Sequence, residues 1–290
     1  MFVIAGVTGH TGGAAAGALL DGGKKVRVIV REASKGDAWN ARGAEVAVAS
    51  FENHGALASA LQGAEGAYLL LPPFAPNETG LAASRRELRE SMISAVRAAR
   101  PAHVVFLSSL GAQHATGTGP IVYLHAMEQD LASSGIPSTF LRAGFFMENW
   151  APNIPGAVLG GALYHALETR KKIPMIASQD IGRAAAELLL EPIPSGARVV
   201  ELSGPEPYSL EDTAAALSRL AGRTIRPITV PASAMEQSLL GMGMSNEVAG
   251  LYREMVEAIN GGKVAEEGGR AQRRRGSTSL ETVLKGLLAV

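Results

Sequence analysis

An apolar strand that runs straight into a glycine turn and then a helix constrains this chain most. Residues 2–7 are apolar and partly β-branched, and they lead into three glycines spaced by three residues. The first glycine of such a turn permits the bend, the second lets a pyrophosphate approach the backbone, and the third lets helix and strand pack closely. The helix dipole and free N–H groups attract the anion. The segment therefore predicts a dinucleotide-binding turn formed by Gly6, Thr8, Gly9, His10, Thr11 and Gly12.

The first 150 residues alternate between short apolar segments and helical ones. Strands are predicted at 2–7, 26–30, 45–49, 67–71, 103–107 and 138–142, and helices at 12–20, 56–61, 81–100 and 123–133. Nearly continuous apolar strands separated by helices are typical of a parallel sheet covered on both faces. We therefore expect an α/β fold with a Rossmann-type, doubly wound parallel sheet in residues 1–150. A smaller, mixed α/β substrate-binding part should follow in residues 151–290, with some segments packing back on the first.

The second half of the chain is less regular. Strands are predicted at 173–177 and 199–202, and helices at 181–190, 214–220, 235–240 and 247–259. Asp180 is expected to cap the helix at 181–190, and Ser209 with Asp212 matches a capping box ahead of the helix at 214–220. Residues 261–276 are polar and glycine-rich. Three consecutive arginines there, 273–275, lie close to Glu266 and Glu267, so we interpret this stretch as a solvated loop.

Composition excludes several classes of protein. The chain of 290 residues is 47% hydrophobic, which is enough to fill a core and excludes wholesale disorder. Lys+Arg and Asp+Glu are both 27, so the basic excess of a nucleic-acid binder is missing. Cysteine is absent, which excludes disulfides and thiol catalysis. The apolar runs are too short to span a membrane, and no metal-ligand spacing or Gly-x-Ser-x-Gly elbow is present. We expect a cytoplasmic protein without a metal.

The end of the second predicted strand indicates which dinucleotide would bind. Arg31 lies where the adenosine ribose of a bound dinucleotide is expected, and Lys35 follows four residues later. An acidic residue there would accept the 2′-OH of NAD, whereas an arginine suits the 2′-phosphate of NADP. Glu32 should point away from Arg31, because successive residues of an extended segment alternate. The sequence therefore predicts NADP(H) as the cofactor.

Several further segments carry a family resemblance over most of the chain. They are Tyr68–Pro73, Val104–Ser109, Glu128, 134–142 and 144–149. Together with the glycine turn, they resemble the NmrA-like group of atypical short-chain dehydrogenases/reductases. That group contains NADPH-dependent quinone oxidoreductases, a triphenylmethane dye reductase and redox-sensing regulators. The resemblance implies further cofactor contacts at Leu70, Leu71, Pro72, Ser108, Gly144 and Phe145. It also implies that the substrate meets Pro73, Phe146, Met147, Asn149 and Trp150.

Two departures, one from ordinary short-chain dehydrogenases and one from the NmrA-like group, leave the proton donor unassigned. Tyr123 is followed four residues later by Met127, so the Tyr-x-x-x-Lys pair is missing. Leu124 stands where the NmrA-like group often has a lysine. His125 and Asn149 are the candidate polar groups for catalysis. Hydride transfer to a quinone or cationic dye needs no protein acid if solvent takes up the charge, and the enzyme then supplies orientation and an apolar site.

The leading hypothesis is an NADPH-dependent oxidoreductase that passes hydride to a quinone-like or other small conjugated acceptor. The alternative is a regulatory protein that senses NADP(H) without turnover. An isomerase or epimerase with tightly bound cofactor is disfavoured by the missing Tyr/Lys pair. The expected partner is a small-molecule acceptor rather than nucleic acid or membrane, and a second copy of the chain in a homodimer is a further candidate.

Overall fold

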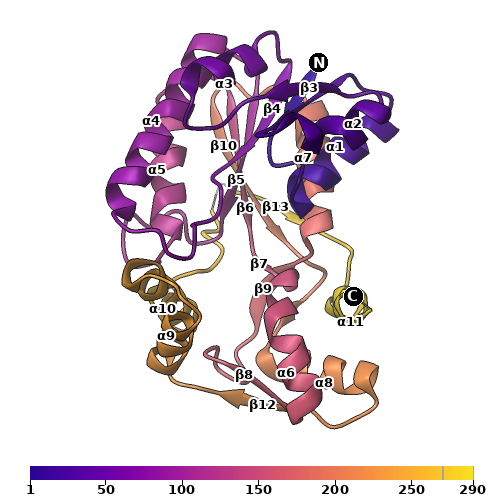
Figure 1. Cartoon of the computed structure of the whole chain (residues 1–290), viewed down its shortest axis with the longest axis vertical. Helices are drawn as coiled ribbons and strands as arrows, with labels where there is room; N and C mark the ends of the chain where they lie inside the picture. Colours follow the sequence, from indigo (N-terminus) through magenta and orange to yellow (C-terminus); the bar gives the residue numbers. More distant parts are fainter. Residues whose placement is uncertain (270, 290) are drawn as a thin grey trace.

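The computed structural model describes residues 1–269 and 271–289, and Figure 1 shows its central sheet above a smaller part. Every pairing in the sheet is parallel. In spatial order the strands are β13 (Gln272–Arg275), β10 (Ala197–Ser203), β6 (Ser138–Ala143), β5 (Val104–Ser109), β4 (Gly66–Leu70), β1 (Phe2–Ile4), β2 (Val26–Val30) and β3 (Glu45–Val48). The order reverses beside β1, so the sheet is doubly wound, and the predicted fold class is confirmed.

Successive side chains along each strand point to opposite faces of the sheet, so a hydrophobic core forms on each face. Phe2 and Ile4 of β1 lie in one core, and Val3 lies in the other. The first face is covered by α1 (His10–Asp21) and α7 (Ser178–Leu190), and the second by α3 (His54–Leu61), α4 (Leu81–Ala99) and α5 (Ile121–Ala132). At Gly182, an added Cβ would lie 2.4 Å from the carbonyl oxygen of Thr11, so α7 packs on α1 at backbone contact.

The last third of the chain returns to the sheet. Helix α7 and the strands β10 and β13 all come from beyond residue 150, yet they complete the layers begun by the first 150 residues. A division near residue 150 therefore stays a proposal, in which the second part contributes one helix and two strands to the first. Among the described residues, no helix is both long and apolar enough to cross a membrane.

The prediction of a solvated loop over residues 261–276 is wrong for its last part. Residues 272–275 form β13, which pairs with β10 at the edge of the sheet. Arg273 and Arg274 are tolerated there because acidic neighbours neutralise them, and Arg275 donates to the carbonyl oxygens of Gly204 and Pro205. Arg274 contacts Glu191 and lies 3.7 Å from Glu187, both on or next to α7, and Arg273 lies 3.2 Å from Glu266. The arginine triplet therefore belongs to an edge strand that is hydrogen-bonded to β10.

The start of α7 also differs from the prediction. The helix begins at Ser178, and its capping carboxylate comes from Glu148, which accepts the Ser178 N–H at 2.9 Å. Asp180 is buried in the first turn and instead accepts from the backbone N–H of Thr278 at 2.8 Å. Asp180 therefore anchors the segment after β13. The capping box of Ser209 and Asp212 is present as predicted.

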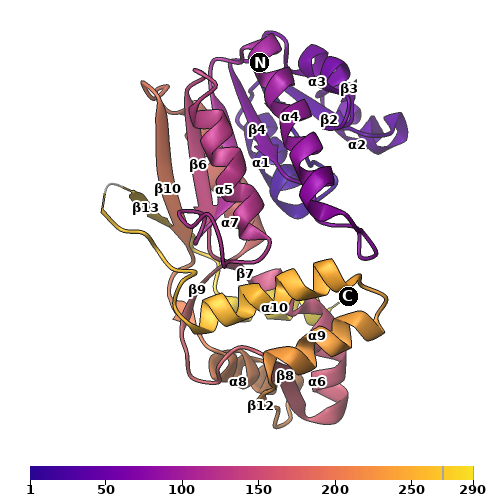
Figure 2. The same cartoon turned by 90° about the vertical axis from the view of Figure 1, so that its left-hand side faces the viewer.

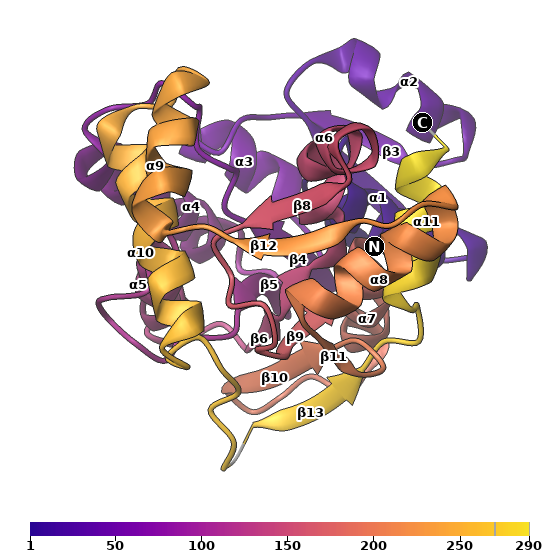
Figure 3. The ribbon, with the colours of Figure 1, turned by 90° about the horizontal axis from the view of Figure 1, so that it is seen from below.

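The smaller part has its own core and hangs below the carboxyl ends of the main strands (Figures 2 and 3). One small sheet has the order β11–β9–β7, and the other pairs β12 with β8. Its elements are β7 (Phe145–Phe146), the 3-10 helix η2 (Met147–Asn153), α6 (Ile154–Gly160), β8 (Ala162–His165), β9 (Ile173–Ile176), β11 (Pro207–Tyr208), α8 (Leu210–Ala221), β12 (Arg226–Thr229), α9 (Ala232–Gly241), α10 (Asn246–Asn260) and α11 (Leu280–Leu288). The short η1 (Ala33–Gly36) and α2 (Asp37–Ala41) link β2 to β3.

Candidate functional site

The glycine turn lies at the carboxyl end of β1, where the strand order reverses. Gly6 has φ +68°, a conformation that favours glycine, and an added Cβ would lie 2.6 Å from Cδ2 of Leu70. At Gly12 an added Cβ would lie 2.4 Å from the carbonyl oxygen of Ala5. These two glycines are therefore required by the protein's own packing, which places α1 and the end of β4 directly against the turn.

Gly9 differs from its two neighbours. A Cβ added there would meet Gly6 O at 3.4 Å and no other described atom within 4 Å. Gly9 is the N-cap of α1, no side chain caps the helix, and its first turn contains no acidic residue. Thr8, Gly9 and His10 are exposed, so this end of the helix and the positive end of its dipole are open to solvent, while the Gly9 N–H itself donates to Gly6 O at 2.9 Å. This arrangement fits an anionic group such as a pyrophosphate.

The adenosine end of the predicted site is basic. Arg31 follows β2 directly and Lys35 lies in η1, and both side chains are exposed. The ion pairs of this edge within the described residues join Arg27 to Glu45 and Arg42 to Asp21. Arg31 and Lys35 take no part in these two pairs, and two exposed positive charges here suit a phosphate. The residues present thus fit a dinucleotide that carries a 2′-phosphate.

Ser108 does not line the cleft as the sequence suggested. Its side chain is buried, and its hydroxyl donates to Glu128 at 2.5 Å. The same carboxylate receives both Nε and Nη2 of Arg142, at 3.0 and 2.6 Å, and Arg142 also donates to Glu267. Because successive residues of a strand point to opposite faces, Ser109 takes the position in the cleft that was expected of Ser108.

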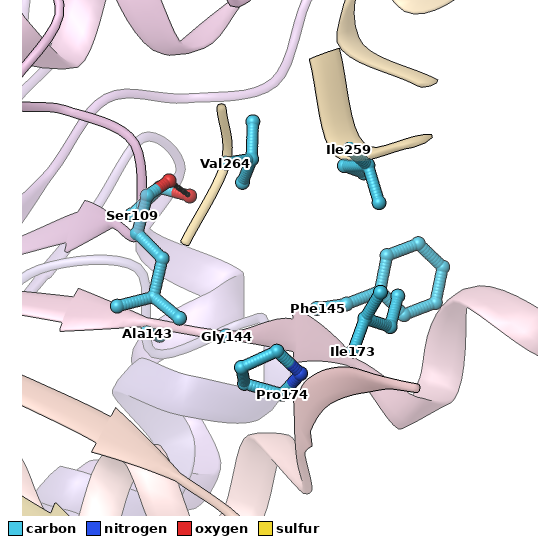
Figure 4. Close-up of a pocket in the computed structure, with 9 residues that line it drawn as sticks. Ser109, Ala143, Gly144, Phe145, Ile173, Pro174, Ile259 and Val264 are labelled. Atoms are coloured by element: carbon cyan, nitrogen blue, oxygen red, sulfur yellow. Dashed lines mark hydrogen bonds between the residues drawn. The ribbon is translucent and has the colours of Figure 1, made fainter. Parts of the chain in front are cut away.

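A small apolar pocket lies between the end of the main sheet and the smaller part, with a volume of about 20 Å³. Figure 4 shows that its walls come from segments far apart in the chain. They are Ser109, Leu110, Ala143, Gly144, Phe145, Ile173, Pro174, Ile259 and Val264. The pocket carries no charged side chain, and the hydroxyl of Ser109 is its single side-chain polar group. Since a cavity of this size holds about one water molecule, any larger acceptor requires the walls to move.

The predicted substrate residues differ in how deeply their side chains are buried. The side chains of Met147 and Trp150 are fully buried in the core of the smaller part, so they support the site without lining it. The Trp150 ring lies 5.7 Å from that of Phe145, which does line the pocket. Phe146 is half-buried and packs against the first core, whereas Asn149 and Pro73 are exposed. Among the predicted cofactor residues, Gly144 and Phe145 reach the pocket, and Leu70 touches the turn.

Two histidines lie near this end of the site. The Nδ1–H of His125 donates to Ala112 O at 2.7 Å, which leaves Nε2 as the other ring nitrogen for a polar contact. His165 was missed by sequence reasoning. Its Nδ1 accepts from the Leu167 N–H at 3.0 Å, and its ring lies 4.9 Å from that of Trp150. Burial lowers the pKa of His165 from 6.5 to about 4, so the ring is neutral at pH 7. Within the described residues, no group of three or more His, Cys, Asp or Glu side chains could hold a metal ion.

The walls Ile173, Pro174, Ile259 and Val264 were also missed. All four come from segments more than 25 residues away from Phe145 in the sequence, and no motif marks any of them. No local pattern distinguishes them from core residues.

A parallel, doubly wound sheet with a glycine turn at its switch point places the chain among Rossmann-type α/β proteins. The chain belongs to the NmrA-like family, whose model matches residues 1–276. It is 27% identical over 255 residues to an NAD(P)H azoreductase of Xenophilus azovorans, covering 88% of this chain and 86% of that one. It is 29% identical over 268 residues to quinone oxidoreductase 2 of Escherichia coli, covering 90% and 89%. A solved structure of the E. coli NADPH-dependent quinone oxidoreductase complexed with NADPH superposes with a TM-score of 0.84 at 25% identity, covering 99% of this chain and 100% of that one.

Proposed function

We propose that the protein is an NADPH-dependent reductase that transfers hydride to a quinone-like or other small conjugated acceptor. The observation that carries the proposal is that two candidate binding regions lie at the same end of the sheet. The uncapped end of α1 and the pocket beside Phe145 both lie at the carboxyl ends of the central strands. Similarity to an azoreductase and a quinone oxidoreductase supports the same reaction class.

The residues divide into three roles along the cleft. The turn of Gly6, Thr8, Gly9, His10, Thr11 and Gly12 would hold the pyrophosphate through backbone N–H groups. Arg31 and Lys35 would hold the 2′-phosphate, and Leu70, Leu71, Pro72, Gly144 and Phe145 would border the nicotinamide. When bound, NADPH supplies the hydride. The chain's own contribution is to orient the two reactants and to exclude water between them.

The reaction does not require a proton donor from the protein. Reduction of a quinone takes one hydride and one proton, and the hydroquinone oxygen can receive that proton from solvent. Ser109 provides the side-chain hydroxyl that lines the pocket, and its Oγ donates to Leu110 O at 2.9 Å. His125 and Asn149 remain candidates for a polar role, with Nε2 of His125 as the ring nitrogen left for a polar contact.

Steady-state oxidation of NADPH with a panel of quinones and azo dyes tests the proposal, with titration calorimetry of NADPH alone as the companion measurement. Turnover with at least one acceptor is expected. Tight NADPH binding without oxidation by any acceptor would favour the alternative, a regulator that senses NADP(H). The relatives that are named for an NAD(P)H-dependent reaction do not favour that alternative.

A further inference from the structure

The loop that follows β4 is attached to a helix far away in the sequence. Residues 71–80 join β4 to α4, and this loop carries Pro72 and Pro73 from the end of β4. In Figure 2 the α9–α10 hairpin lies directly below the loop. The N–H groups of Gly80 and Leu81 each donate to the carboxylate of Glu247, at 2.9 Å. Glu247 lies in the first turn of α10.

This carboxylate replaces a cap that α4 lacks. The N-cap residue of α4 is Gly80, in the left-handed region at φ +67°, and glycine has no side chain with which to cap the helix. Two backbone hydrogen bonds from Gly80 and Leu81 lower the pKa of Glu247, as expected for a carboxylate at a helix N-terminus. The first turn of α4 is therefore completed by a residue 166 positions later in the chain.

Ser245 adds a second attachment next to the first. Its backbone N–H donates to Pro76 O at 2.8 Å, and its hydroxyl donates to Glu78 O at 2.5 Å. The Glu78 carboxylate in turn pairs with Arg85 at 2.7 Å. The hairpin is thus attached to the middle of the loop as well as to its end.

Arg85 carries the attachment to the start of the loop. Its side chain is 6% exposed, and it donates to Pro72 O at 2.9 Å while lying 4.2 Å above the Phe74 ring. A continuous chain of hydrogen bonds and ion pairs therefore runs from Ser245 through Glu78 and Arg85 to the backbone of Pro72.

The other end of the same hairpin helix forms the roof of the apolar pocket. Ile259 in the last turn of α10 and Val264 just after it line that pocket. Because a pocket of about 20 Å³ holds about one water molecule, a larger acceptor requires its walls, this roof among them, to move. One rigid helix of 15 residues therefore connects the pocket wall to the loop after β4.

We propose that Glu247 is a positioning residue that links the roof of the acceptor pocket to the loop bearing Pro72 and Pro73, so that dinucleotide binding orders the roof. This inference rests on the proposed function, in which that loop borders the nicotinamide. The link acts in both directions, since any coupling between two binding sites is reciprocal. The dinucleotide would thus prepare the pocket for its acceptor.

The test compares Glu247→Ala, Glu247→Gln and Glu257→Ala by hydrogen exchange with and without NADPH. Glu257 is the matched control, because it lies on the same helix and pairs with Arg253 at 3.1 Å rather than with the loop. In free Glu247→Ala, residues 71–81 should exchange faster than in wild type. NADPH should protect the glycine turn in every variant, but it should protect α9–α10 in wild type and Glu257→Ala and not in Glu247→Ala.

Steady-state kinetics give the second readout. KM for the acceptor should rise about three- to tenfold in Glu247→Ala, while kcat and the dissociation constant of NADPH change less than about twofold. Glu247→Gln should recover part of the loss, because its amide oxygen still accepts one N–H. A global loss of packing would not produce this split between KM and kcat.

The outcomes separate the two proposals. Wild type without NADPH protection at the glycine turn contradicts the proposed function. Protection at the turn without protection of the wild-type hairpin, or with a hairpin response retained in Glu247→Ala, overturns the link. In the free protein, equal exchange of residues 71–81 in wild type and Glu247→Ala overturns the link by itself, whatever the cofactor result.

Discussion

The two ends of the cleft are built in opposite ways. At the glycine turn, the uncapped end of α1 and two exposed cations suit a charged ligand, and the turn itself is one short segment, residues 6–12, at the end of one strand. At the pocket, apolar side chains from the main sheet, β9 and α10 close around about 20 Å³. The first end requires a negatively charged ligand to balance its positive charge. The second end requires its packed side chains to move apart before an acceptor can enter. Substitutions at the two ends should therefore fail in different ways.

The largest effect is expected at Gly9. A valine there meets little of the protein, since Gly6 O at 3.4 Å is the nearest described atom, but its side chain would occupy the space in front of the helix end. Gly9→Val should weaken NADPH binding by more than about a hundredfold. Titration calorimetry of the folded variant provides the measurement.

Gly156→Val is the matched control, because Gly156 also has open space around it but lies in α6 of the smaller part. Gly12→Ala sharpens the contrast, since its Cβ would press on backbone and destabilise the fold by about 1–3 kcal/mol. Unchanged NADPH affinity in folded Gly9→Val would remove the turn as the phosphate site.

Arg31 should give the next largest effect, and it should act on one cofactor only. A charge-assisted hydrogen bond to the 2′-phosphate contributes about 1.5–3 kcal/mol, which corresponds to roughly ten- to a hundredfold in affinity. Arg31→Ala should weaken NADPH by that factor and leave NADH nearly unchanged. The preference should shrink as salt rises, because this residue is exposed. Dissociation constants for both cofactors provide the measurement.

Arg42→Ala removes the same charge from the same edge of the sheet, but Arg42 pairs with Asp21. It should keep most of the cofactor preference. If wild type prefers NADH, or if Arg31→Ala weakens both cofactors equally, Arg31 does not select the phosphate.

Much of the first end could be predicted from the sequence for a physical reason. Strand, turn and helix are consecutive, so the spacing of Gly6, Gly9 and Gly12 already implies the bend and the close packing. The parallel sheet follows from continuous apolar strands, and the capping box of Ser209 is a local motif. Even here the sequence did not show which of two neighbouring serines lines the cleft. Strand alternation makes either Ser108 or Ser109 face the cleft, and sequence alone did not show that the buried partner Glu128 takes Ser108.

The second end could be predicted much less well, because it depends on contacts between distant segments. Ile259 and Val264 become pocket walls through the path of α10, and no local periodicity encodes that path. Met147 and Trp150 looked like exposed contacts because they follow a strand end, but a separate core buries them. Arg274 of β13 looked solvated because its acidic partners, Glu187 and Glu191, lie more than 80 residues away on or next to α7.

Lowering the pH is expected to have a smaller effect, on the free energy of unfolding, and this effect should come from the pocket end of the cleft rather than from the glycine turn. Burial lowers the pKa of His165 from 6.5 to about 4. Between these two values the unfolded chain binds a proton that the folded protein does not, so the free energy of unfolding falls as pH drops. The loss should be about 1 kcal/mol between pH 7 and pH 5.5. Urea unfolding at both pH values, in wild type and His165→Gln, measures it.

The pH dependence should be reduced in His165→Gln and retained in His10→Gln, whose side chain is exposed at the glycine turn. His103 should contribute in the same direction, because burial lowers its pKa to about 4 as well. An unaltered pH dependence in His165→Gln would show that His165 titrates as it does in the unfolded chain.

The smallest effect is expected from widening the pocket. Val264→Ala removes apolar volume from a wall that is half-buried, so a bulkier acceptor should fit with less movement of the roof. The ratio of KM values for a one-ring and a two-ring quinone should shift about twofold in favour of the larger one. Val283→Ala, in the same core but outside the pocket, is the control. Equal ratios in the two variants would place the acceptor elsewhere.

One measurement tests the central claim most directly, namely that hydride passes from a dinucleotide at the turn to an acceptor at the pocket. The protein is mixed with NADPH and a quinone in the absence of other reductants, and loss of reduced nicotinamide is followed together with formation of hydroquinone. The account predicts one hydroquinone formed for each NADPH oxidised, with catalysis lost in Gly9→Val. Saturable NADPH binding by wild type with no oxidation across the panel of acceptors would contradict it.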